Sequence, residues 1–148
     1  MKPKIIVVMP AYNAEKTLEK TYLDLPRNLI DEIIVVDDKS KDKTVDIAKN
    51  LHLNFIVHQQ NLGYGGNQKT CYREALKRKP DIVVMLHPDY QYDSARTADL
   101  VQPILDNKFD LMFGSRIRTR AEALKGGMPL IKYILNRIYT VIENIVLG

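Results

Sequence analysis

The chain has 148 residues, 45% of them apolar and 27% charged, with 22 Lys and Arg against 18 Asp and Glu and a formal net charge of +4. This composition is ordinary for one soluble globular domain, and the mild, dispersed positive charge suits an anionic ligand but excludes the concentrated basic stripe of a nucleic-acid-binding protein. Cys71 is the only cysteine, which excludes an intrachain disulfide and agrees with a cytoplasmic location, and no stretch is long and apolar enough for a membrane span or a signal peptide.

Short β-branched runs alternate with stretches of helical spacing in the first half of the chain. The runs predict buried strands over Lys4–Met9, Glu32–Asp37 and Asn54–His58, and Pro10 is expected to break the chain after the first. Apolar residues on one helical face predict helices over Ala14–Leu25, over Val45–Leu51, and from a glycine-rich loop, Asn61–Gly66, to about Lys79.

The second half continues the alternation. Strands are predicted over Asp81–Leu86 and Phe109–Phe113, with a helix between them over Ser94–Asn107 that Pro103 is expected to kink or divide. A basic loop follows over Arg116–Gly127, and residues 129–148 carry an apolar helix, Leu130–Leu147. Residues 1–148 therefore predict a single α/β domain with a mostly parallel sheet covered on both faces, in which ligands bind outside the carboxyl ends of the strands.

Two adjacent acids, Asp37 and Asp38, follow the second predicted strand. One carboxylate at such a position can cap the turn around Ser40, and the other can accept hydrogen bonds from a base or ribose, or hold a metal. We expect one of the two to be structural and the other to face a ligand. His58, at the end of the third strand, could face the same cleft, although a structural hydrogen bond is the simpler expectation, and Cys71 is expected in the core.

Glycines gather between Asn61 and Asn67, close to the start of a predicted helix. Backbone N–H groups at a helix N-terminus favour phosphate, and Lys69 could add a cation for a diphosphate. The match to G-x-G-x-x-G is poor, and the loop follows the third strand instead of the first. Taken alone, the glycines are therefore explained better by a tight strand-to-helix turn.

The most informative segment places His87, Asp89 and Gln91 at alternate positions directly after the fourth strand. Alternate side chains of an extended backbone lie on one side, so an imidazole, a carboxylate and an amide oxygen could converge on one divalent cation. The alternative is a polar surface turn built around Pro88. Three such residues together at the carboxyl end of a strand favour the metal site.

Taken in order, five stretches of this sequence resemble family-2 glycosyltransferases of the GT-A fold, in their polyprenyl-phosphate branch. The stretches are Val8–Glu15, Ile34–Thr44, Asn61–Gly66, Leu86–Gln91 and Gly114–Arg116. The resemblance implies a nucleoside-diphosphate sugar as donor, a polyprenyl phosphate as a possible acceptor and Mn²⁺ or Mg²⁺ as cofactor.

The resemblance also implies roles for single residues. Pro10, Tyr12 and Glu15 would line the base pocket, and Asp38, together with Asp37, would contact the base or ribose. Asp89 matches the second acid of the metal-binding D-x-D motif and Gln91 the glutamine that follows it. Arg116 matches an arginine that meets the acceptor phosphate.

Two features depart from the family pattern. His87 stands where the first acid of D-x-D is usual, and a neutral imidazole suits Mg²⁺ poorly and a transition metal better. Family members also continue well beyond position 148, so the sequence is interpreted as truncated, with no convincing catalytic base after Arg116.

These observations predict a metal-dependent glycosyltransferase that inverts the anomeric carbon. Two alternatives stay open: a nucleotide-binding module without transferase activity, and a nucleotidyltransferase, for which Pro10–Asn13 is the wrong loop.

The C-terminal helix is expected to contact something apolar. It has too many apolar residues for one narrow stripe, while Lys132, Arg137 and Glu143 argue against a membrane span. Burial against further C-terminal residues, a homo-oligomer contact or a membrane surface would each satisfy it. We expect a protein contact for this chain alone and peripheral attachment to the inner face of the membrane for the intact enzyme. The apolar residues are Leu130, Ile131, Ile134, Leu135, Ile138, Val141, Ile142, Ile145 and Leu147.

Overall fold

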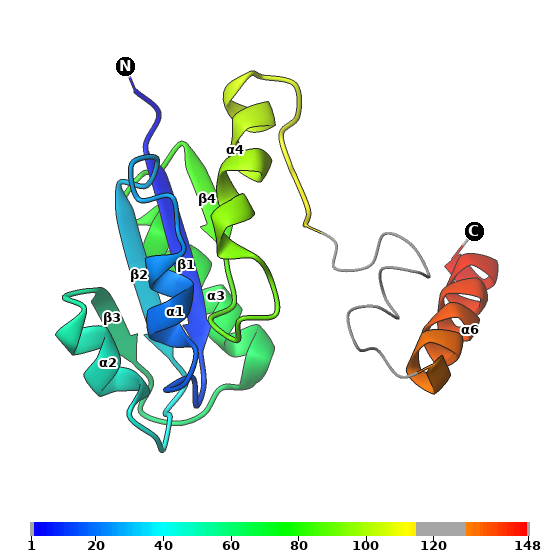
Figure 1. Cartoon of the computed structure of the whole chain (residues 1–148), viewed down its shortest axis with the longest axis horizontal. Helices are drawn as coiled ribbons and strands as arrows, with labels where there is room; N and C mark the ends of the chain where they lie inside the picture. Colours follow the sequence, from blue (N-terminus) through cyan, green and yellow to red (C-terminus); the bar gives the residue numbers. More distant parts are fainter. Residues whose placement is uncertain (1, 115–129, 148) are drawn as a thin grey trace. The chain divides into compact units, whose positions relative to one another are not determined.

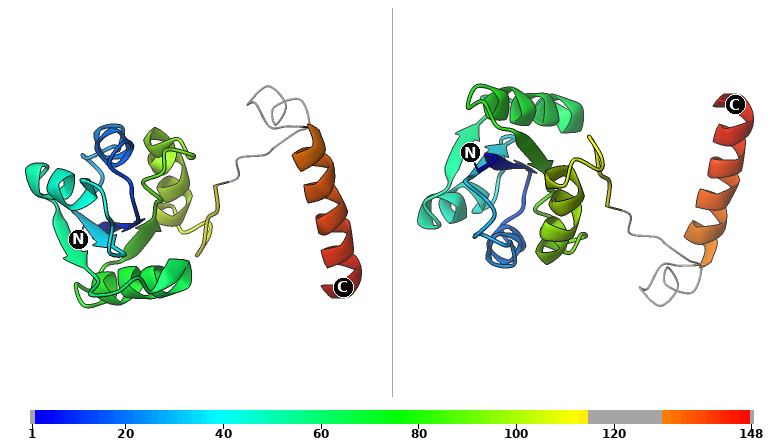
Figure 2. Two further views of the ribbon diagram at one scale, coloured as in Figure 1. Left: turned by 90° about the horizontal axis from the view of Figure 1, so that it is seen from below. Right: turned by 90° about the horizontal axis from the view of Figure 1, so that it is seen from above.

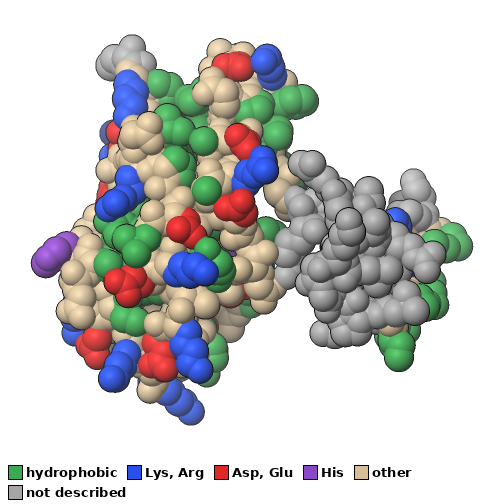
Figure 3. Space-filling view, viewed as in Figure 1, with side chains coloured by type: hydrophobic (Ala, Val, Ile, Leu, Met, Phe, Trp, Pro, Cys, Tyr) green, Lys and Arg blue, Asp and Glu red, His purple; other side chains and the backbone are tan. Residues whose placement is uncertain are grey.

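The computed structural model describes residues 2–114 and 130–147. The chain divides into two compact units, Met1–Phe113 and Gly114–Gly148, and each is considered by itself. Lys and Arg side chains are interspersed with Asp and Glu on the face of the first unit seen in Figure 3, as the dispersed charge of the sequence indicates. Among the described helices, none has the length and apolar character needed to cross a membrane.

A four-stranded parallel sheet forms the centre of the first unit (Figure 1). Its order is β3-β2-β1-β4, so the two strands at the centre, β1 and β2, are also the most completely buried. The strands are β1 (Ile5–Ala11), β2 (Glu32–Asp37), β3 (Asn54–Val57) and β4 (Ile82–Met85). The helices are α1 (Leu18–Leu23), α2 (Thr44–Asn50), α3 (Gly63–Leu76), the short 3-10 helix η1 (Ser94–Arg96) and α4 (Thr97–Leu105).

Helices cover both faces of the sheet, because alternate side chains of β1 and β2 point to opposite sides. Val7 and Val35 pack in the cluster that includes residues of α1 and α2, whereas Val8 and Val36 pack with Cys71 and its neighbours on α3. Figure 2 shows α3 alone on one side of the sheet and α1, α2 and α4 on the other. The predicted α/β architecture is confirmed, and all four strands are parallel.

The first strand is longer than predicted, since Pro10 lies within β1 and pairs with Val36. Proline has no backbone N–H to donate, but none is needed toward β4, because the pairing of β1 with β4 stops at Val8 and Met85. The expectation that Pro10 breaks the strand was wrong, and the strand instead carries the chain two residues further toward the cleft described below.

The first helix is shorter than predicted, beginning at Leu18 instead of Ala14. The backbone N–H groups of Asn13, Ala14 and Glu15 donate to side chains of the segment before and at the start of α2, which holds this part of the chain in a turn. The acceptors are Ser40, Thr44 and Asp42. Tertiary hydrogen bonds therefore replace the helical ones that the spacing predicted.

The third helix begins earlier than predicted. Its first turn contains the glycines that were expected to form a loop, and the Asn61 side chain accepts the N–H of Gly63 at 2.9 Å in the turn that leads into the helix. In the other unit, α6 (Leu130–Leu147) has the bounds that the apolar pattern predicts.

The fifth predicted strand is absent from the described residues. Phe109, Leu111 and Phe113 alternate as a strand would, but they are 56%, 64% and 81% exposed and no described strand pairs with them. Alternation gives only a propensity, whereas a strand also needs a neighbour for its backbone hydrogen bonds. The helix before this segment continues through Pro103 to Leu105 and is not divided there.

Candidate functional site

A cleft of about 850 Å³ opens at the carboxyl ends of the strands. The segments that follow β1, β2, β3 and β4 all contribute to it, as expected for a ligand site in an open parallel sheet. Its lining residues are Pro10, Ala11, Tyr12, Asn13, Ala14, Glu15, Lys16, Thr17, Asp38, Asp42, Asn61, Gly63, Tyr64, Asn67, His87, Pro88 and Asp89.

The end of β1 supplies the first wall. Pro10, Tyr12 and Glu15 all line the cleft, and Tyr12 is 51% exposed, so its ring is available to stack on a planar ligand. Glu15 also has a structural role, because Oε2 accepts the backbone N–H of Lys43 at 3.1 Å.

The segment after β2 holds this wall in place. Asp42 accepts the N–H of Glu15 at 3.0 Å and the hydroxyl and N–H of Thr44. Burial alone would raise the pKa of Asp42, but these hydrogen bonds outweigh it and lower the pKa below its ordinary value. Asp42 therefore stays ionised and is a weak base.

The two adjacent acids lie in different surroundings. Asp37 is buried and accepts both the N–H of Ser40, at 2.8 Å, and its hydroxyl, which fixes the turn after β2. Asp38 lines the cleft although its side chain is only 3% exposed. The structure thus assigns Asp37 a place in the turn and Asp38 a place on the cleft floor, and their contact with a ligand remains a prediction.

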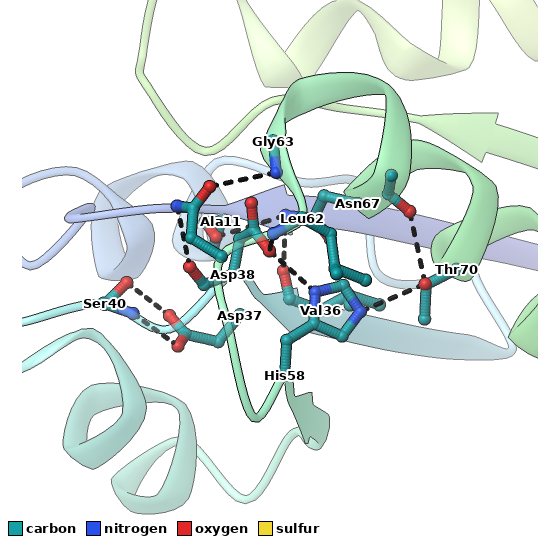
Figure 4. A network of polar contacts seen from close by, with 12 residues as sticks. Ala11, Val36, Asp37, Asp38, Ser40, His58, Leu62, Gly63, Asn67 and Thr70 are labelled. Carbon is teal, nitrogen blue, oxygen red and sulfur yellow. Dashed lines mark hydrogen bonds and ion pairs between the residues drawn. The ribbon is translucent and has the colours of Figure 1, made fainter.

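Asp38 belongs to a buried polar network (Figure 4). Its Oδ1 lies 2.7 Å from His58 Nδ1 and accepts the N–H of Leu62 at 2.8 Å, and His58 Nε2 lies 3.0 Å from the Thr70 hydroxyl. The structural hydrogen bond expected for His58 is present. His58 is not among the residues that line the cleft.

The N-terminal turn of α3 forms another part of the floor. Gly63 has φ of +72°, a conformation that favours glycine, and a Cβ on Gly66 would lie 2.6 Å from that of Leu62. Two of the three glycines are therefore explained by backbone geometry and close packing, without a phosphate.

Two further residues of α3 lie away from the cleft. Cys71 is fully buried, and this burial raises the pKa of its thiol to about 12, so Cys71 is a core residue as expected. Lys69 is exposed and does not line the cleft.

Asn67 is a buried residue of this floor that the sequence did not indicate. Its amide donates to the carbonyl oxygens of Ala11 and Val36, at 3.3 and 3.0 Å, and so ties α3 to the ends of the two central strands. Its Oδ1 has no hydrogen-bond partner among the described residues. An asparagine in a polar, glycine-rich segment gives no sequence signal of burial, so only the fold reveals it.

The segment after β4 brings His87 and Asp89 to the cleft, but Gln91 is not among the lining residues. Asp89 Oδ1 accepts the backbone N–H of Gln91 at 3.0 Å, so the turn is closed by the backbone of Gln91. The His87 ring stacks on Tyr64 from α3, with ring centroids 5.2 Å apart and the Tyr64 hydroxyl 3.2 Å from Nε2. Tyr64 is thus a second residue of the cleft that the spacing of the sequence did not indicate.

These donors fit a divalent cation only in part. Within residues 2–114 and 130–147 no group of three His, Cys, Asp or Glu side chains could hold a metal alone. Asp89 and His87 supply one carboxylate and one imidazole, so the remaining ligands would have to come from a bound diphosphate and water. Arg116, the predicted acceptor-phosphate residue, lies outside the described residues.

Comparisons with known proteins show a family match and several similar proteins. Residues 6–146 match the family model described as glycosyl transferase family 2. The chain is 38% identical over 135 residues to an uncharacterized protein of Methanocaldococcus jannaschii, covering 91% of the chain and 55% of that protein. It is 33% identical over 149 residues to the UDP-N-acetylglucosamine–dolichyl-phosphate N-acetylglucosaminyltransferase of Methanococcus voltae, covering 89% of the chain and 59% of that protein.

A solved structure shares the fold. Glucosyl-3-phosphoglycerate synthase from Mycobacterium tuberculosis, in complex with Mn²⁺, UDP and glucosyl-3-phosphoglycerate, matches with a TM-score of 0.58 and 29% identity, over 70% of this chain and 40% of that one. The present chain spans about half the length of the curated relatives it matches.

Proposed function

Because the chain belongs to glycosyl transferase family 2, we propose that its cleft binds a nucleoside-diphosphate sugar and that the whole protein transfers the sugar to an acceptor. The observation that carries this proposal is that Tyr12, Asp38 and Asp89 line one cleft at the carboxyl ends of β1, β2 and β4. Support comes from the name of the M. voltae relative, which specifies UDP-N-acetylglucosamine, and from the UDP described with the M. tuberculosis enzyme.

In this proposal the base and ribose lie against the wall formed after β1. The Tyr12 ring stacks on the base, Pro10 and Glu15 shape the pocket, and the Asp38 carboxylate accepts a hydrogen bond from the base or the ribose. Asp37 contributes indirectly: by accepting the N–H of Ser40 it fixes the turn that contains Asp38.

The diphosphate then lies toward Asp89 and His87. A divalent cation bound there would neutralise the charge that develops on the departing diphosphate. Asp89 is its principal protein ligand, with His87 beside it, and the imidazole favours Mn²⁺ over Mg²⁺. The Mn²⁺ in the M. tuberculosis structure supports a divalent metal in this fold.

The carboxylates of the cleft favour a phosphate acceptor over a hydroxyl acceptor, because three of them are not free to act as a general base. Glu15, Asp38 and Asp42 are all engaged as hydrogen-bond acceptors within the protein. A hydroxyl nucleophile needs a general base, whereas an anionic phosphate oxygen does not. We therefore propose that the acceptor is a lipid-linked phosphate, which attacks with inversion of the anomeric carbon. The name of the M. voltae relative, which contains dolichyl phosphate, supports this class of acceptor.

The exposed apolar side chains of α6 fit an acceptor held in a membrane. Ile131, Ile134, Ile138, Ile142 and Ile145 are between 48% and 76% exposed and recur at helical spacing. Such a helix can lie in the interface of a bilayer or pack on a second chain. We propose peripheral attachment to the inner membrane face for the whole protein.

The experiment that tests the donor site is a thermal-shift panel of UDP, GDP, ADP and CDP, each with Mn²⁺, Mg²⁺ or chelator. Stabilisation by one nucleoside diphosphate that requires a divalent metal is the expected result. No stabilisation by any member of the panel would contradict the proposal. Nucleotide binding without transfer, in a protein extended to the length of its relatives, would instead favour a binding module.

A further inference from the structure

Tyr90 connects the segment after β4 to α1, a helix from a different part of the chain. Its hydroxyl donates to Asp24 Oδ2 at 2.5 Å, and the ammonium of Lys20 lies 3.9 Å from the centre of its ring. Lys20 and Asp24 are four residues apart, so they lie on one face of α1 and its C-terminal end. Together they hold the phenol at two points, outside the residues that line the cleft.

A second contact joins the same two segments of the chain. The hydroxyl of Thr17, the residue directly before α1, donates to the carbonyl oxygen of Pro88 at 2.5 Å. Pro88 is buried and lines the cleft, as Thr17 does. Asp89, the proposed metal ligand, is therefore the single residue between two points, Pro88 and Tyr90, at which its segment is attached to α1 and the residue before it.

The backbone of Tyr90 has a conformation that glycine adopts readily and a bulky residue does not. Its φ is +58°, in the left-handed region where the Cβ is crowded by the neighbouring backbone. A residue other than glycine keeps such a conformation only where the surrounding contacts impose it. The two contacts of the phenol with α1 supply this constraint from the side chain.

The turn at Tyr90 determines where the Asp89 carboxylate lies. It brings the N–H of Gln91 back to Asp89, whose Oδ1 accepts it at 3.0 Å. Within the part of the chain that the structure describes, the hydrogen bonds to this carboxylate end at Oδ1, which leaves Oδ2 for a cation. Asp89 is exposed, so packing does not fix its rotamer, and the turn is what orients the side chain.

We propose that Tyr90 is a positioning residue for the metal site: by docking its phenol on Lys20 and Asp24, it holds the turn in which Asp89 presents its carboxylate to the cleft. The proposal rests on the proposed function, because Asp89 can hold a metal for the nucleotide only if the cleft binds one. A contact that merely stabilised the fold would not change the contribution of the metal to nucleotide binding. Two measurements separate the position of Asp89 from its effect on binding.

The position of Asp89 is measured in the free protein by amide hydrogen exchange, followed by NMR. Tyr90→Phe keeps the ring near Lys20 but removes the hydroxyl, and Asp24→Ala removes the same hydrogen bond from the side of α1. Both variants are expected to speed up exchange at the N–H of Gln91, which Asp89 accepts, while exchange in β1 stays the same. Unchanged exchange at Gln91 in both variants would overturn the proposal, whether or not UDP binds.

The effect on binding is measured by calorimetry with UDP and Mn²⁺, and with uridine, which has no diphosphate to share a metal. Tyr90→Phe and Asp24→Ala are each expected to weaken UDP binding about tenfold, because the fraction of chains with Asp89 in place falls by that factor. Uridine binding should not change. An equal loss for UDP and uridine would overturn the proposal. If UDP does not bind the unaltered chain but the exchange effect is present, the donor site fails and the positioning of Asp89 by Tyr90 stands.

A double-mutant cycle tests whether the two side chains act through their shared hydrogen bond. In an Asp24→Ala background this bond is already absent, so Tyr90→Phe is expected to cost no further UDP affinity, and losses that add would overturn the proposal. Asp24 is exposed, so Asp24→Ala still decides if Tyr90→Phe folds poorly. The control is Tyr72→Phe on α3, where the tyrosine is 45% exposed and does not line the cleft; it should leave UDP affinity and the exchange at Gln91 unchanged.

Discussion

Thr44 is the residue whose removal should most clearly loosen the wall of the cleft. Its side chain is fully buried, its Oγ1 accepts the N–H of Ala14 at 2.7 Å, and it donates to Asp42 Oδ1 at 2.5 Å. Thr44→Val keeps the shape of the side chain but removes the oxygen. It therefore leaves the buried N–H of Ala14 without an acceptor and removes one hydrogen-bond donor from the ionised Asp42 carboxylate.

The magnitude follows from these two losses. A buried donor without a partner costs about 1–3 kcal/mol, and a hydrogen bond to a charged group contributes about 1.5–3 kcal/mol. Because the Asp42 carboxylate keeps the N–H of Glu15 and that of Thr44 itself, we take the lower part of the second range. Thr44→Val should then lower the free energy of unfolding by about 3 kcal/mol.

Thr21 provides a matched control for this substitution. It is also buried, but its hydroxyl has no hydrogen-bond partner among the described residues. Thr21→Val should therefore leave the stability unchanged or raise it, since it removes a buried polar atom that gains nothing from the fold.

Urea unfolding followed by circular dichroism measures both variants. Thr44→Val should shift the midpoint to lower urea at an unchanged m-value, and Thr21→Val should not. Equal losses in the two variants would refute the reasoning, because packing and not hydrogen bonding would then explain both. UDP affinity should also fall in Thr44→Val, since the turn after β1 lines the cleft.

Three further predictions concern metal, pH and the C-terminal helix. Asp89→Asn should abolish the metal dependence of nucleotide binding, and His87→Asp should shift the preference from Mn²⁺ toward Mg²⁺, both by calorimetry; metal dependence that survives Asp89→Asn would show that the ligand assignment is wrong. Hydrogen bonds lower the pKa of Asp42 in the folded state, so its contribution to stability is complete above the unfolded pKa of about 4 and is lost as pH falls through the lower folded value; Asp42→Asn should flatten this part of the stability curve between acid and neutral pH, and an unchanged curve would exclude Asp42. Deleting residues 130–148 should reduce self-association and liposome binding in sedimentation experiments while nucleotide binding persists, and a chain that is monomeric and binds no liposomes before the deletion would contradict the contact proposed for α6.

The sequence predicts the sheet well because its central strands are buried on both faces. Continuous β-branched runs such as Glu32–Asp37 leave little choice of element, and the observed bounds of β2 are the predicted ones. The errors arise where tertiary contacts override local pattern. Side chains near the start of α2 hold Ala14 and Glu15 in a turn, and the segment 109–113 alternates without a partner among the described strands.

The candidate site was predictable where residues follow strands directly. Asp38, His87 and Asp89 all line the cleft, since the carboxyl ends of parallel strands meet at one edge. Asn67, Tyr64 and the partners of His58 were not predictable, because they depend on how the first turns of α3 pack on that edge. Lys69 and Gln91 are not among the lining residues, so their predicted ligand contacts stay predictions.

The measurement that tests the central claim most directly is calorimetric titration of the chain with UDP and Mn²⁺, repeated with Asp38→Asn. The account predicts one-to-one binding that requires the metal and that weakens by tenfold or more, about 1.4 kcal/mol, in the variant. Binding of the same affinity in both proteins would contradict the account, because the cleft floor at Asp38 would then not be the nucleotide site.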